Sequence, residues 1–305
     1  MSRIVSIGEA MLELSGAEEG ADLWRLGIAG DTFNTAWYLR RLAGGARAVD
    51  YVTRVGTAAF SQRIVSFLEA EGIGTAHVGR EPERGCGLYA ITLDRGERSF
   101  AYWRGQSAAR CLADSAETLD RALSGAVLAY FSGITLAILA PDGRGRLLER
   151  IAAGPARVAF DPNIRPALWE SPEAALEWIE RAARASDIVL PSADDEASAF
   201  GDASAEATRT RYAGYGVGEV VVKAGGAPVP YREGAEEGVV EGLPRVEPID
   251  TTGAGDSFNA GYLRARLDGR SVPDAVRAGH ALASRVVRGR GALVREAVDE
   301  AGTRA

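Results

Sequence analysis

The stretch Ile249-Asp250-Thr251-Thr252-Gly253-Ala254-Gly255-Asp256-Ser257-Phe258 carries the most information about this chain's fold and site. It is a polar, glycine-rich loop followed by apolar residues at helical spacing from Ala260 to Leu267, so we expect the loop to end at a helix N-terminus. Backbone N–H groups and the positive end of the helix dipole meet there and stabilise a bound phosphate. Glycines let the backbone approach the phosphate oxygens closely. The segment Gly253-Ala254-Gly255 is therefore a candidate anion-binding loop.

Asp256 falls in the first turn of this expected helix. A carboxylate at that place can accept the proton of an attacking hydroxyl group, a role that contributes about 10²–10⁴-fold in rate. The structural alternative is that Asp256 only caps the helix, and an isolated GxGD pattern leaves that alternative open. Asp256 and the loop before it are the candidate catalytic groups.

Other motifs for phosphate binding and for nucleophilic catalysis are missing from the sequence. GxxxxGK[ST] does not occur, which excludes the P-loop class, and no GxGxxG opens a helix because Phe258 occupies the last glycine position. A dinucleotide-dependent dehydrogenase is therefore disfavoured. The histidines His77 and His280 support no Ser/His/Asp triad. Cys86 and Cys111 form no CxxC pair, which argues against disulfides and structural zinc.

Composition narrows the class of protein further. The 305 residues are 46% hydrophobic and 25% charged, as in ordinary globular proteins, and the net charge is −7 without a Lys/Arg-rich block. Nucleic acid and anionic membrane surfaces are therefore unlikely partners on electrostatic grounds. No window holds the roughly eighteen apolar residues of a membrane span, and the N-terminus has no signal-peptide pattern. We expect a cytoplasmic protein.

Short β-branched runs alternate with amphipathic helical patterns along the chain, which predicts an α/β fold with a mainly parallel central sheet covered by helices on both faces. The expected strands cover residues 4–7, 127–131, 158–160, 188–190 and 220–222. Two extended runs, Leu88–Leu93 and Ser99–Trp103, are joined by Asp94-Arg95-Gly96-Glu97 and predict a hairpin. This hairpin either belongs to a small β-subdomain over the sheet or forms an antiparallel edge of the same sheet.

Further candidate residues lie in loops that follow expected strands, where α/β proteins bind ligands. Arg104 and Arg165 offer planar forks that match a carboxylate or phosphate and suggest an anionic substrate, or each pairs with a local acid on the surface. Lys223 ends a strand and either reaches nucleotide phosphates or is solvated. The acidic run Asp194-Asp195-Glu196 either organises Mg²⁺ through water or only favours a helix N-terminus.

Taken together, these motifs resemble the ribokinase-like, phosphofructokinase-B type family of carbohydrate kinases, from Gly8-Glu9 to Arg290-Gly291-Ala292. The segment Asp250–Phe258 matches the family's C-terminal signature. This match favours the role of Asp256 as the catalytic base over that of a helix cap. The resemblance implies a single kinase domain over residues 1–305, with a β-lid formed by inserted strands at roughly 11–28 and 86–105. Segments 30–36, 98–104, 132–134 and 160–166 resemble the branch that phosphorylates 2-keto-3-deoxy-D-gluconate in Entner-Doudoroff type catabolism.

The resemblance also implies roles for individual residues. It places the open-chain keto acid against Gly30, Asp31, Asn34, Tyr89, Tyr102, Arg104, Arg165 and Asp256. It places the nucleotide against Asn163, Lys223, Gly225, Gly226, Gly253, Ala254 and Gly255. The implied cofactors are ATP and Mg²⁺, with a monovalent cation as a further candidate. Two departures stand out: Ala29 replaces a hinge glycine, and Ser192 replaces the asparagine of an NxxE magnesium motif, which leaves Asp195 or Glu196 as the metal residue.

The expected reaction is ATP-dependent phosphorylation of 2-keto-3-deoxygluconate to 2-keto-3-deoxy-6-phosphogluconate. Another sugar kinase of this family, such as a fructokinase, is the first alternative, and it would leave Arg104 and Arg165 without an anion. The non-enzymatic alternative is an inactive sugar-binding regulator on the same fold. The expected partners are the sugar acid, ATP and further copies of the chain, as a dimer through the lid or as a higher oligomer.

Overall fold

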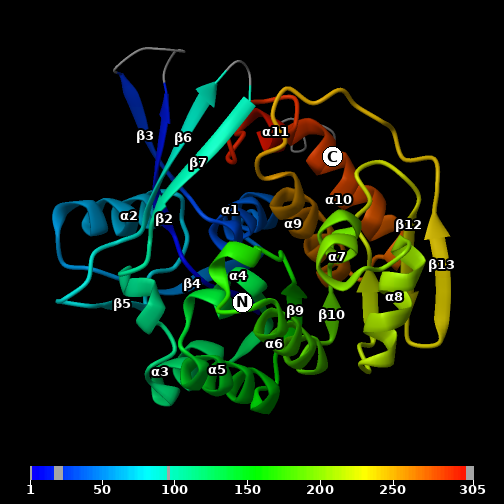
Figure 1. Cartoon of the computed structure of the whole chain (residues 1–305), viewed down its shortest axis with the longest axis horizontal. Helices are drawn as coiled ribbons and strands as arrows, with labels where there is room; N and C mark the ends of the chain where they lie inside the picture. The colour runs from blue at the N-terminus through cyan, green and yellow to red at the C-terminus, as the bar shows by residue number, and fades with distance from the viewer. Residues whose placement is uncertain (1, 17–22, 95–96, 300–305) are drawn as a thin grey trace.

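The computed structural model describes residues 2–16, 23–94 and 97–299, and within them a nine-stranded sheet forms the centre of the molecule (Figure 1). The strands from β11 to β5 are parallel, and β12 and β13 extend one edge in antiparallel pairing. Across the sheet the order is β13 (Glu236–Val240), β12 (Val229–Glu233), β11 (Glu219–Val221), β10 (Ile188–Val189), β9 (Arg157–Asp161), β8 (Ala126–Ser132), β1 (Ser2–Ile7), β4 (Arg47–Val55) and β5 (Val78–Arg80). The predicted, mainly parallel α/β sheet is confirmed.

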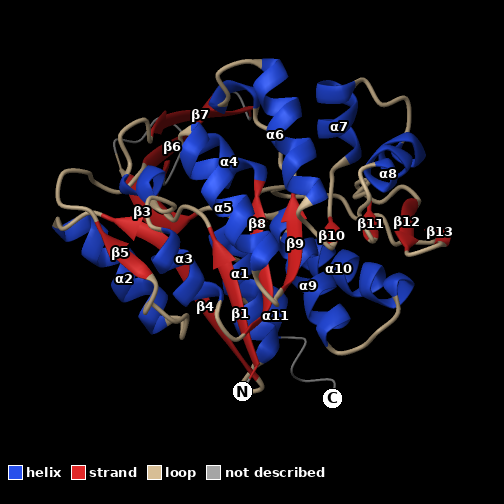
Figure 2. Ribbon diagram, turned by 90° about the horizontal axis from the view of Figure 1, so that it is seen from below, coloured by secondary structure: helices blue, strands red, loops and turns tan. Residues whose placement is uncertain are grey.

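Helices cover both faces of this sheet (Figure 2). One face carries α1 (Asp31–Ala43), α2 (Ala59–Ala70), α9 (Ala254–Leu267), α10 (Val272–Val286) and α11 (Glu296–Asp299). The other carries α3 (Ala116–Leu123), α4 (Gly133–Ile138), α5 (Pro141–Ala153), α6 (Pro172–Arg184), α7 (Ala193–Phe200), α8 (Ala205–Gly214) and the 3₁₀ turns η1 (Ala108–Cys111) and η2 (Pro166–Leu168). None of the helices in the described ranges is long and apolar enough to cross a bilayer.

Strand β8 shows why the central strands appear as nearly continuous apolar runs. Its alternate residues point to opposite faces, so Leu128 and Tyr130 enter the core beneath α1 and α9, while Ala129 and Phe131 enter the core beneath α4 to α6. All four are almost fully buried. A strand buried on both faces has no polar face, and its sequence lacks the alternation of a surface strand.

Helix α9 begins at the carboxyl edge of the sheet, and it packs closely on α10. A Cβ atom on Gly261 would lie 2.9 Å from the Cα atom of Gly279, and one on Gly279 would lie 2.7 Å from the carbonyl oxygen of Phe258. Side chains at either glycine would push the two helices apart. This contact therefore sets the close approach of α9 to α10.

A second, smaller sheet stands above α1 and α2 at the upper left of Figure 1. Its strand order is β3 (Trp24–Ala29), β2 (Met11–Gly16), β6 (Leu88–Asp94) and β7 (Glu97–Trp103). The hairpin β6–β7 pairs with β2 and not with the main sheet. Its expected turn residues, Arg95 and Gly96, lie outside the described residues. The action of this small sheet as a lid, and the treatment of residues 1–305 as one domain, stay predictions.

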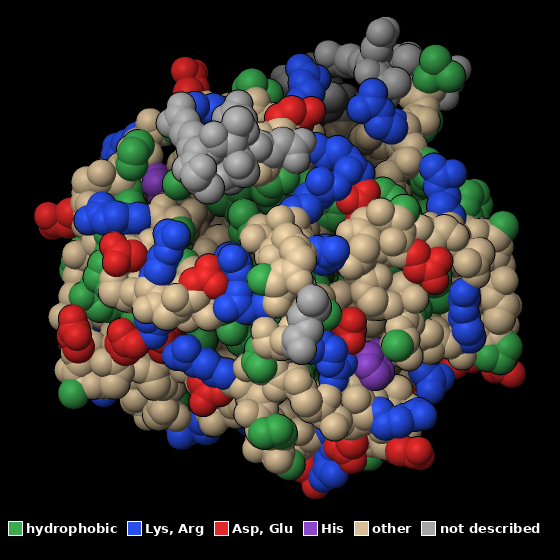
Figure 3. Space-filling view, turned by 180° about the vertical axis from the view of Figure 1, so that it is seen from behind, with side chains coloured by type: hydrophobic (Ala, Val, Ile, Leu, Met, Phe, Trp, Pro, Cys, Tyr) green, Lys and Arg blue, Asp and Glu red, His purple; other side chains and the backbone are tan. Residues whose placement is uncertain are grey.

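The molecular surface carries both signs of charge. On the face shown in Figure 3, Lys and Arg side chains are interspersed with Asp and Glu side chains. Many of the surface pairs are local, such as Arg181 with Glu177 and Arg184 with Glu180, both four residues apart on α6. Exposed pairs of this kind contribute about 0.3–0.5 kcal/mol each, so the fold depends far more on its two apolar cores.

Candidate active site

A cleft of about 1220 Å³ opens where the carboxyl ends of the main strands meet the small sheet, α9 and α10. This is the edge at which open α/β sheets bind ligands. The candidate residues that line the cleft are Gly30, Asp31, Asn34, Tyr89, Tyr102, Arg104, Asn163, Arg165, Asp195, Lys223, Gly225, Gly226, Gly253, Ala254, Gly255 and Asp256. Glu196 is the one candidate that the structure does not bring to this cleft.

The loop Gly253-Ala254-Gly255, here called the anion loop, forms the start of α9. Gly253 is the N-cap with a φ of 75°, and a Cβ atom there would lie 2.7 Å from the carbonyl oxygen of Ala292, so the position requires glycine. Asp250 holds the loop by accepting hydrogen bonds from the backbone N–H groups of Thr252 (2.9 Å) and Gly291 (2.6 Å). The N–H groups of Gly255 and Asp256 have no acceptor among the described residues. Two donors at a helix N-terminus therefore face the cleft.

Asp256 lies beside these donors at the floor of the cleft. Asn34 Nδ2 donates a 2.8 Å hydrogen bond to its Oδ2 atom. Desolvation, followed by repulsion from Asp31, raises the pKa of Asp256 to about 8, against the stabilising effect of the Asn34 amide and of Lys223. A carboxylate with a pKa in this range is a stronger base than an ordinary aspartate and can accept a proton from a hydroxyl group.

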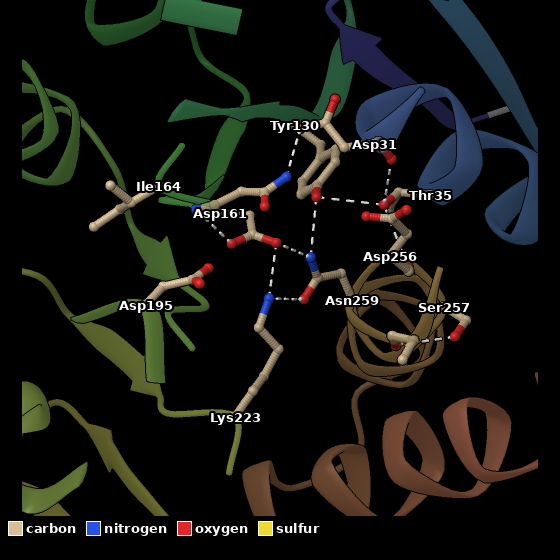
Figure 4. A network of polar contacts seen from close by, with 12 residues as sticks. Asp31, Thr35, Tyr130, Asp161, Ile164, Asp195, Lys223, Asp256, Ser257 and Asn259 are labelled. Atoms are coloured by element: carbon tan, nitrogen blue, oxygen red, sulfur yellow. Dashed lines mark hydrogen bonds and ion pairs between the residues drawn. The ribbon is translucent and has the colours of Figure 1, made fainter. Parts of the chain in front are cut away.

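Lys223 approaches the anion loop from the opposite side, at the end of β11. Its Nζ atom donates to Asp161 Oδ2 (2.7 Å) and to Asn259 Oδ1 (3.3 Å), as Figure 4 shows. A Cβ atom on Gly255 would lie 3.6 Å from this Nζ atom. A phosphate on the anion loop would therefore lie between the loop donors and the Lys223 ammonium group.

The sugar side of the cleft is formed by residues that already bond to one another. A Cβ atom on Gly30 would lie 2.2 Å from the carbonyl oxygen of Glu9, and the Gly30 N–H group donates to Asn34 Oδ1 (3.3 Å). Asp31 Oδ2 accepts a 2.9 Å hydrogen bond from Asn163 Nδ2. The side chain of Asn163, which the resemblance assigns to the nucleotide, thus reaches the sugar side here. Its φ of 35° is unusual for a residue other than glycine.

Both arginines of the cleft have acidic partners. Arg104, which is 7% exposed, donates from Nε (2.9 Å) and Nη2 (2.5 Å) to Glu9 Oε2. Arg165, whose side chain is about half exposed, donates from Nη1 to Asp195 Oδ2 (3.0 Å). The alternative of pairing with an acid at the surface therefore holds for Arg165, whereas Arg104 pairs with an acid in the interior. Arg104 Nη1 and Arg165 Nη2 have no acceptor among the described residues, so both retain donors for a ligand.

The two metal candidates have different surroundings. Asp195 lines the cleft, whereas Glu196 is fully buried, accepts hydrogen bonds from Arg211 Nη2 (2.6 Å) and Tyr212 Oη (2.9 Å), and lies away from the cleft. Burial raises the pKa of Glu196 to about 7, against the effect of Arg211. The described residues contain no cluster of three or more His, Cys, Asp or Glu side chains that could hold a metal. This donor set fits Mg²⁺ carried mainly by nucleotide phosphates and water.

Beyond Lys223 the cleft continues between the loop 244–248 and α10. Gly225 (φ 55°) and Gly226 (φ 93°) turn the chain after the lysine. The lining residues there that the sequence analysis did not assign to a ligand are Pro244, Arg245, Val246, Pro248, His280, Ala283, Ser284 and Val287. Pro244, Val246, Pro248, Ala283 and Val287 give this end an apolar wall suited to a nucleobase. No sequence signal marks the members in the loop 244–248, because that loop has neither helical nor strand periodicity.

Phosphoryl transfer is the chemistry that this arrangement can support, because anion donors, a proton acceptor and a cation converge on one point. With the parallel sheet and the small second sheet, it defines the class of ribokinase-like small-molecule kinases. Residues 1–296 match the family model described as pfkB family carbohydrate kinase. The chain belongs to this family.

Individual relatives and solved structures agree with this assignment. A 2-dehydro-3-deoxygluconokinase of Escherichia coli K12 is 41% identical over 308 aligned positions, which cover 97% of this chain and 98% of that protein. The crystal structure of a PfkB protein from Polaromonas sp. JS666 has a TM-score of 0.86 at 28% identity and covers 98% of this chain and 99% of its own. A fructokinase double mutant from Vibrio cholerae O395, with fructose, ADP and potassium ion bound, shares the fold with a TM-score of 0.83 at 24% identity over 98% of each chain.

Proposed function

We propose that this protein transfers the γ-phosphoryl group of ATP to the 6-hydroxyl of 2-keto-3-deoxy-D-gluconate, which gives 2-keto-3-deoxy-6-phosphogluconate and ADP. The observation that carries the proposal is the position of Asp256, with its raised pKa, beside the unpaired N–H groups of the anion loop. The 41% identity to a 2-dehydro-3-deoxygluconokinase over nearly the whole chain supports the choice of substrate.

The proposed transfer is an in-line displacement. Asp256 takes the proton of the substrate hydroxyl, whose oxygen bonds to the γ-phosphorus while the bond from that phosphorus to the β,γ-bridging oxygen breaks and ADP leaves. The N–H groups of Gly255 and Asp256 would stabilise the charge on the transferred group, at the positive end of α9. The loop Gly253-Ala254-Gly255 and Asp256 together form the proposed catalytic centre.

The sugar acid is proposed to bind with its carboxylate toward Arg104 and Arg165. Their remaining guanidinium N–H groups can donate to the substrate while Glu9 and Asp195 hold each guanidinium in place. The hydroxyl and keto groups of the substrate would meet Gly30, Asp31, Asn34, Tyr89 and Tyr102, which line the same end of the cleft.

ATP is proposed to lie along the other end, with its phosphates against Lys223, Gly225, Gly226 and the anion loop. Asn163 borders both ends. A bound Mg²⁺ would offset the negative charge of the phosphates, and Asp195 is the residue proposed to hold it through water. A monovalent cation is a further proposed cofactor.

A dimer is the proposed assembly, and the cytoplasm, where ATP is available, the proposed location. The small sheet presents large apolar side chains to solvent, among them Trp103 at 59% and Trp24 at 43% exposure. Aromatic side chains in this setting are typical of protein interfaces. Light scattering after size exclusion should give twice the chain mass, and Trp103→Glu should convert the protein to monomer; a monomeric wild type would contradict this assembly.

The function is tested by a coupled ADP-release assay with Mg-ATP that compares 2-keto-3-deoxygluconate with fructose, ribose and gluconate at equal concentration. Preference for the keto-deoxy acid supports the proposal. Preference for fructose would leave the proposed role of Asp256 unchanged but would contradict the assignment of the sugar acid as substrate. No turnover with any sugar, together with retained sugar binding, would favour a sugar-binding regulator.

A further inference from the structure

Lys223 is the only lysine in the chain, and the other 34 of its 35 basic Lys and Arg residues are arginines. In a sequence that uses arginine at every other such position, the one exception lies in the candidate active site. Arginine and lysine differ in ways that matter at a small site, because guanidinium is planar and broad, whereas ammonium is compact with three hydrogens. The question is therefore what in the structure requires an ammonium group at position 223.

The surroundings of the Lys223 Nζ atom form a small, defined site. Asp161 Oδ2 (2.7 Å) and Asn259 Oδ1 (3.3 Å) accept two of its hydrogens. Gly255 of the anion loop borders the third side, where a Cβ atom built on this glycine would lie 3.6 Å from Nζ. Asp161 is 3% exposed and Asn259 is fully buried, so neither can move aside easily. We call this arrangement of Asp161, Asn259 and Gly255 the ammonium site.

Asn259 is itself held firmly. Its Nδ2 group donates to Asp161 Oδ2 (2.7 Å) and to Tyr130 Oη (3.0 Å), so both amide hydrogens and the amide oxygen are used (Figure 4). Tyr130 is fully buried and accepts a further hydrogen bond from Thr35 Oγ1 (3.3 Å). These contacts fix the orientation of the amide, because a rotated Asn259 would present hydrogens to the Lys223 ammonium group.

The same residue links the ammonium site to the catalytic helix. Asn259 lies on α9 three residues after Asp256, one helical turn further from the anion loop. Asp161 ends β9, and Lys223 follows β11, so three separate elements meet at one nitrogen atom. A displacement of α9 would therefore move the anion loop and the acceptor of Lys223 together.

We propose that Asp161 and Asn259 are positioning residues that hold the Lys223 ammonium group beside the anion loop, in a site that accepts lysine and excludes arginine. This inference rests on the proposed function. When ATP binds, one N–H group of Lys223 turns to a phosphate oxygen while Asp161 retains another. A guanidinium group is broader than an ammonium group, so beside Asp161 and Asn259 it would fill the space next to Gly255 that the phosphate needs.

The first experiment measures Mg-ATP binding by titration calorimetry, without sugar. Lys223→Arg keeps the charge, and it should weaken binding about tenfold or more, the size expected for loss of a charged hydrogen bond. Wild-type affinity in Lys223→Arg would overturn the inference. Wild type that binds Mg-ATP but leaves the sugar acid unphosphorylated would contradict the proposed function alone.

The second experiment is chemical rescue. Lys223→Ala leaves a gap the size of propylammonium, which should restore Mg-ATP binding, while guanidinium at equal concentration should not. In Lys223→Ala/Asn259→Ala the rescue should weaken about tenfold, because the free amine has lost one acceptor. Equal rescue by guanidinium, or rescue unaffected by Asn259, would overturn the inference.

Two further variants separate the loss of a positioning contact from a general loss of folding. Tyr262→Phe removes another buried hydrogen bond of α9, from the Tyr262 hydroxyl to Glu219, and should leave ATP affinity unchanged. If Asn259→Ala does not fold, Asp161→Asn keeps the shape of the ammonium site but removes its charge, and it should lower the rescue in Lys223→Ala in the same way. Unchanged rescue in that variant would contradict the inference.

Discussion

Asn34 Nδ2 donates a 2.8 Å hydrogen bond to Asp256 Oδ2 and joins the first turn of α1 to the first turn of α9 across the floor of the cleft. Asp256 Oδ1 accepts no hydrogen bond from the described residues. The amide therefore fixes the carboxylate while leaving one oxygen for a substrate hydroxyl. It also opposes the rise in the pKa of Asp256 that burial and Asp31 produce.

Asp256→Asn should lower kcat by about 10²–10⁴-fold, the usual contribution of a general base, while Mg-ATP affinity changes little. The amide keeps the shape of the carboxylate but cannot take the proton. Steady-state kinetics and titration calorimetry on the same preparation would separate the two effects. Turnover close to wild type would remove Asp256 from the mechanism and return it to the role of a helix cap.

Activity should depend on pH through the same residue. Because Asp256 must be ionised to act, and its pKa in the free protein is raised to about 8, kcat/KM should fall about tenfold per pH unit below that value and level off above it. The folded state holds this proton more tightly than the unfolded state, so the contribution of Asp256 to stability is lost as pH rises toward 8. Asp256→Asn should therefore melt at a higher temperature than wild type at pH 8 but not at pH 4. Equal melting curves at pH 8 would contradict the raised pKa.

The parallel core of the fold could be predicted because its strands are buried on both faces. The run Val127–Phe131 is apolar throughout and lies within β8, and Val158–Phe160 lies within β9. The strands Arg47–Val55 and Glu236–Val240 could not be found in the same way. The first carries charged residues at three positions, and the second lies at an exposed edge of the sheet, so neither shows a continuous apolar run.

The candidate site was harder to complete from the sequence than to locate. Glu9, the partner of Arg104, is 95 residues away along the chain, and no local pattern connects them. Asp195 and Glu196 are adjacent on a helix, where successive side chains point about 100° apart, and Asp195 lines the cleft whereas Glu196 does not. Which one does depends on how α7 packs on α8, through Glu196 and Arg211. That packing is a tertiary property.

Arg165→Ala should raise KM for the sugar acid roughly ten- to a hundredfold, because one charged hydrogen bond contributes about 1.5–3 kcal/mol, and it should leave KM for ATP nearly unchanged. Arg181→Ala is the matched control, since Arg181 is equally exposed and also pairs with an acid, Glu177, but lies on α6 away from the cleft. Equal KM values for Arg165→Ala and wild type would show that the substrate carboxylate does not bind at Arg165.

Arg104→Met should destabilise the fold by about 3–5 kcal/mol, because it leaves the buried Glu9 carboxylate without its partner. Replacing both residues, as Glu9→Met/Arg104→Met, removes the uncompensated charge and should recover most of that loss. Urea unfolding followed by circular dichroism measures the free energies of unfolding. A double variant as unstable as Arg104→Met would show that packing around Arg104, and not the charge of Glu9, is responsible.

Gly253→Ala should lower both stability and activity. Gly234→Ala is the matched control, because it introduces the same backbone strain without the steric clash. Both glycines have positive φ, 75° at Gly253 and 60° at Gly234, so alanine at either position costs about 1–2 kcal/mol of backbone strain. At Gly234, in the turn between β12 and β13, a Cβ atom meets nothing within 4 Å, whereas at Gly253 it lies 2.7 Å from the Ala292 carbonyl oxygen. Gly253→Ala should therefore melt at a lower temperature than Gly234→Ala and lose Mg-ATP binding as the anion loop shifts. If both variants bind Mg-ATP as wild type does, the anion loop does not contact the phosphates.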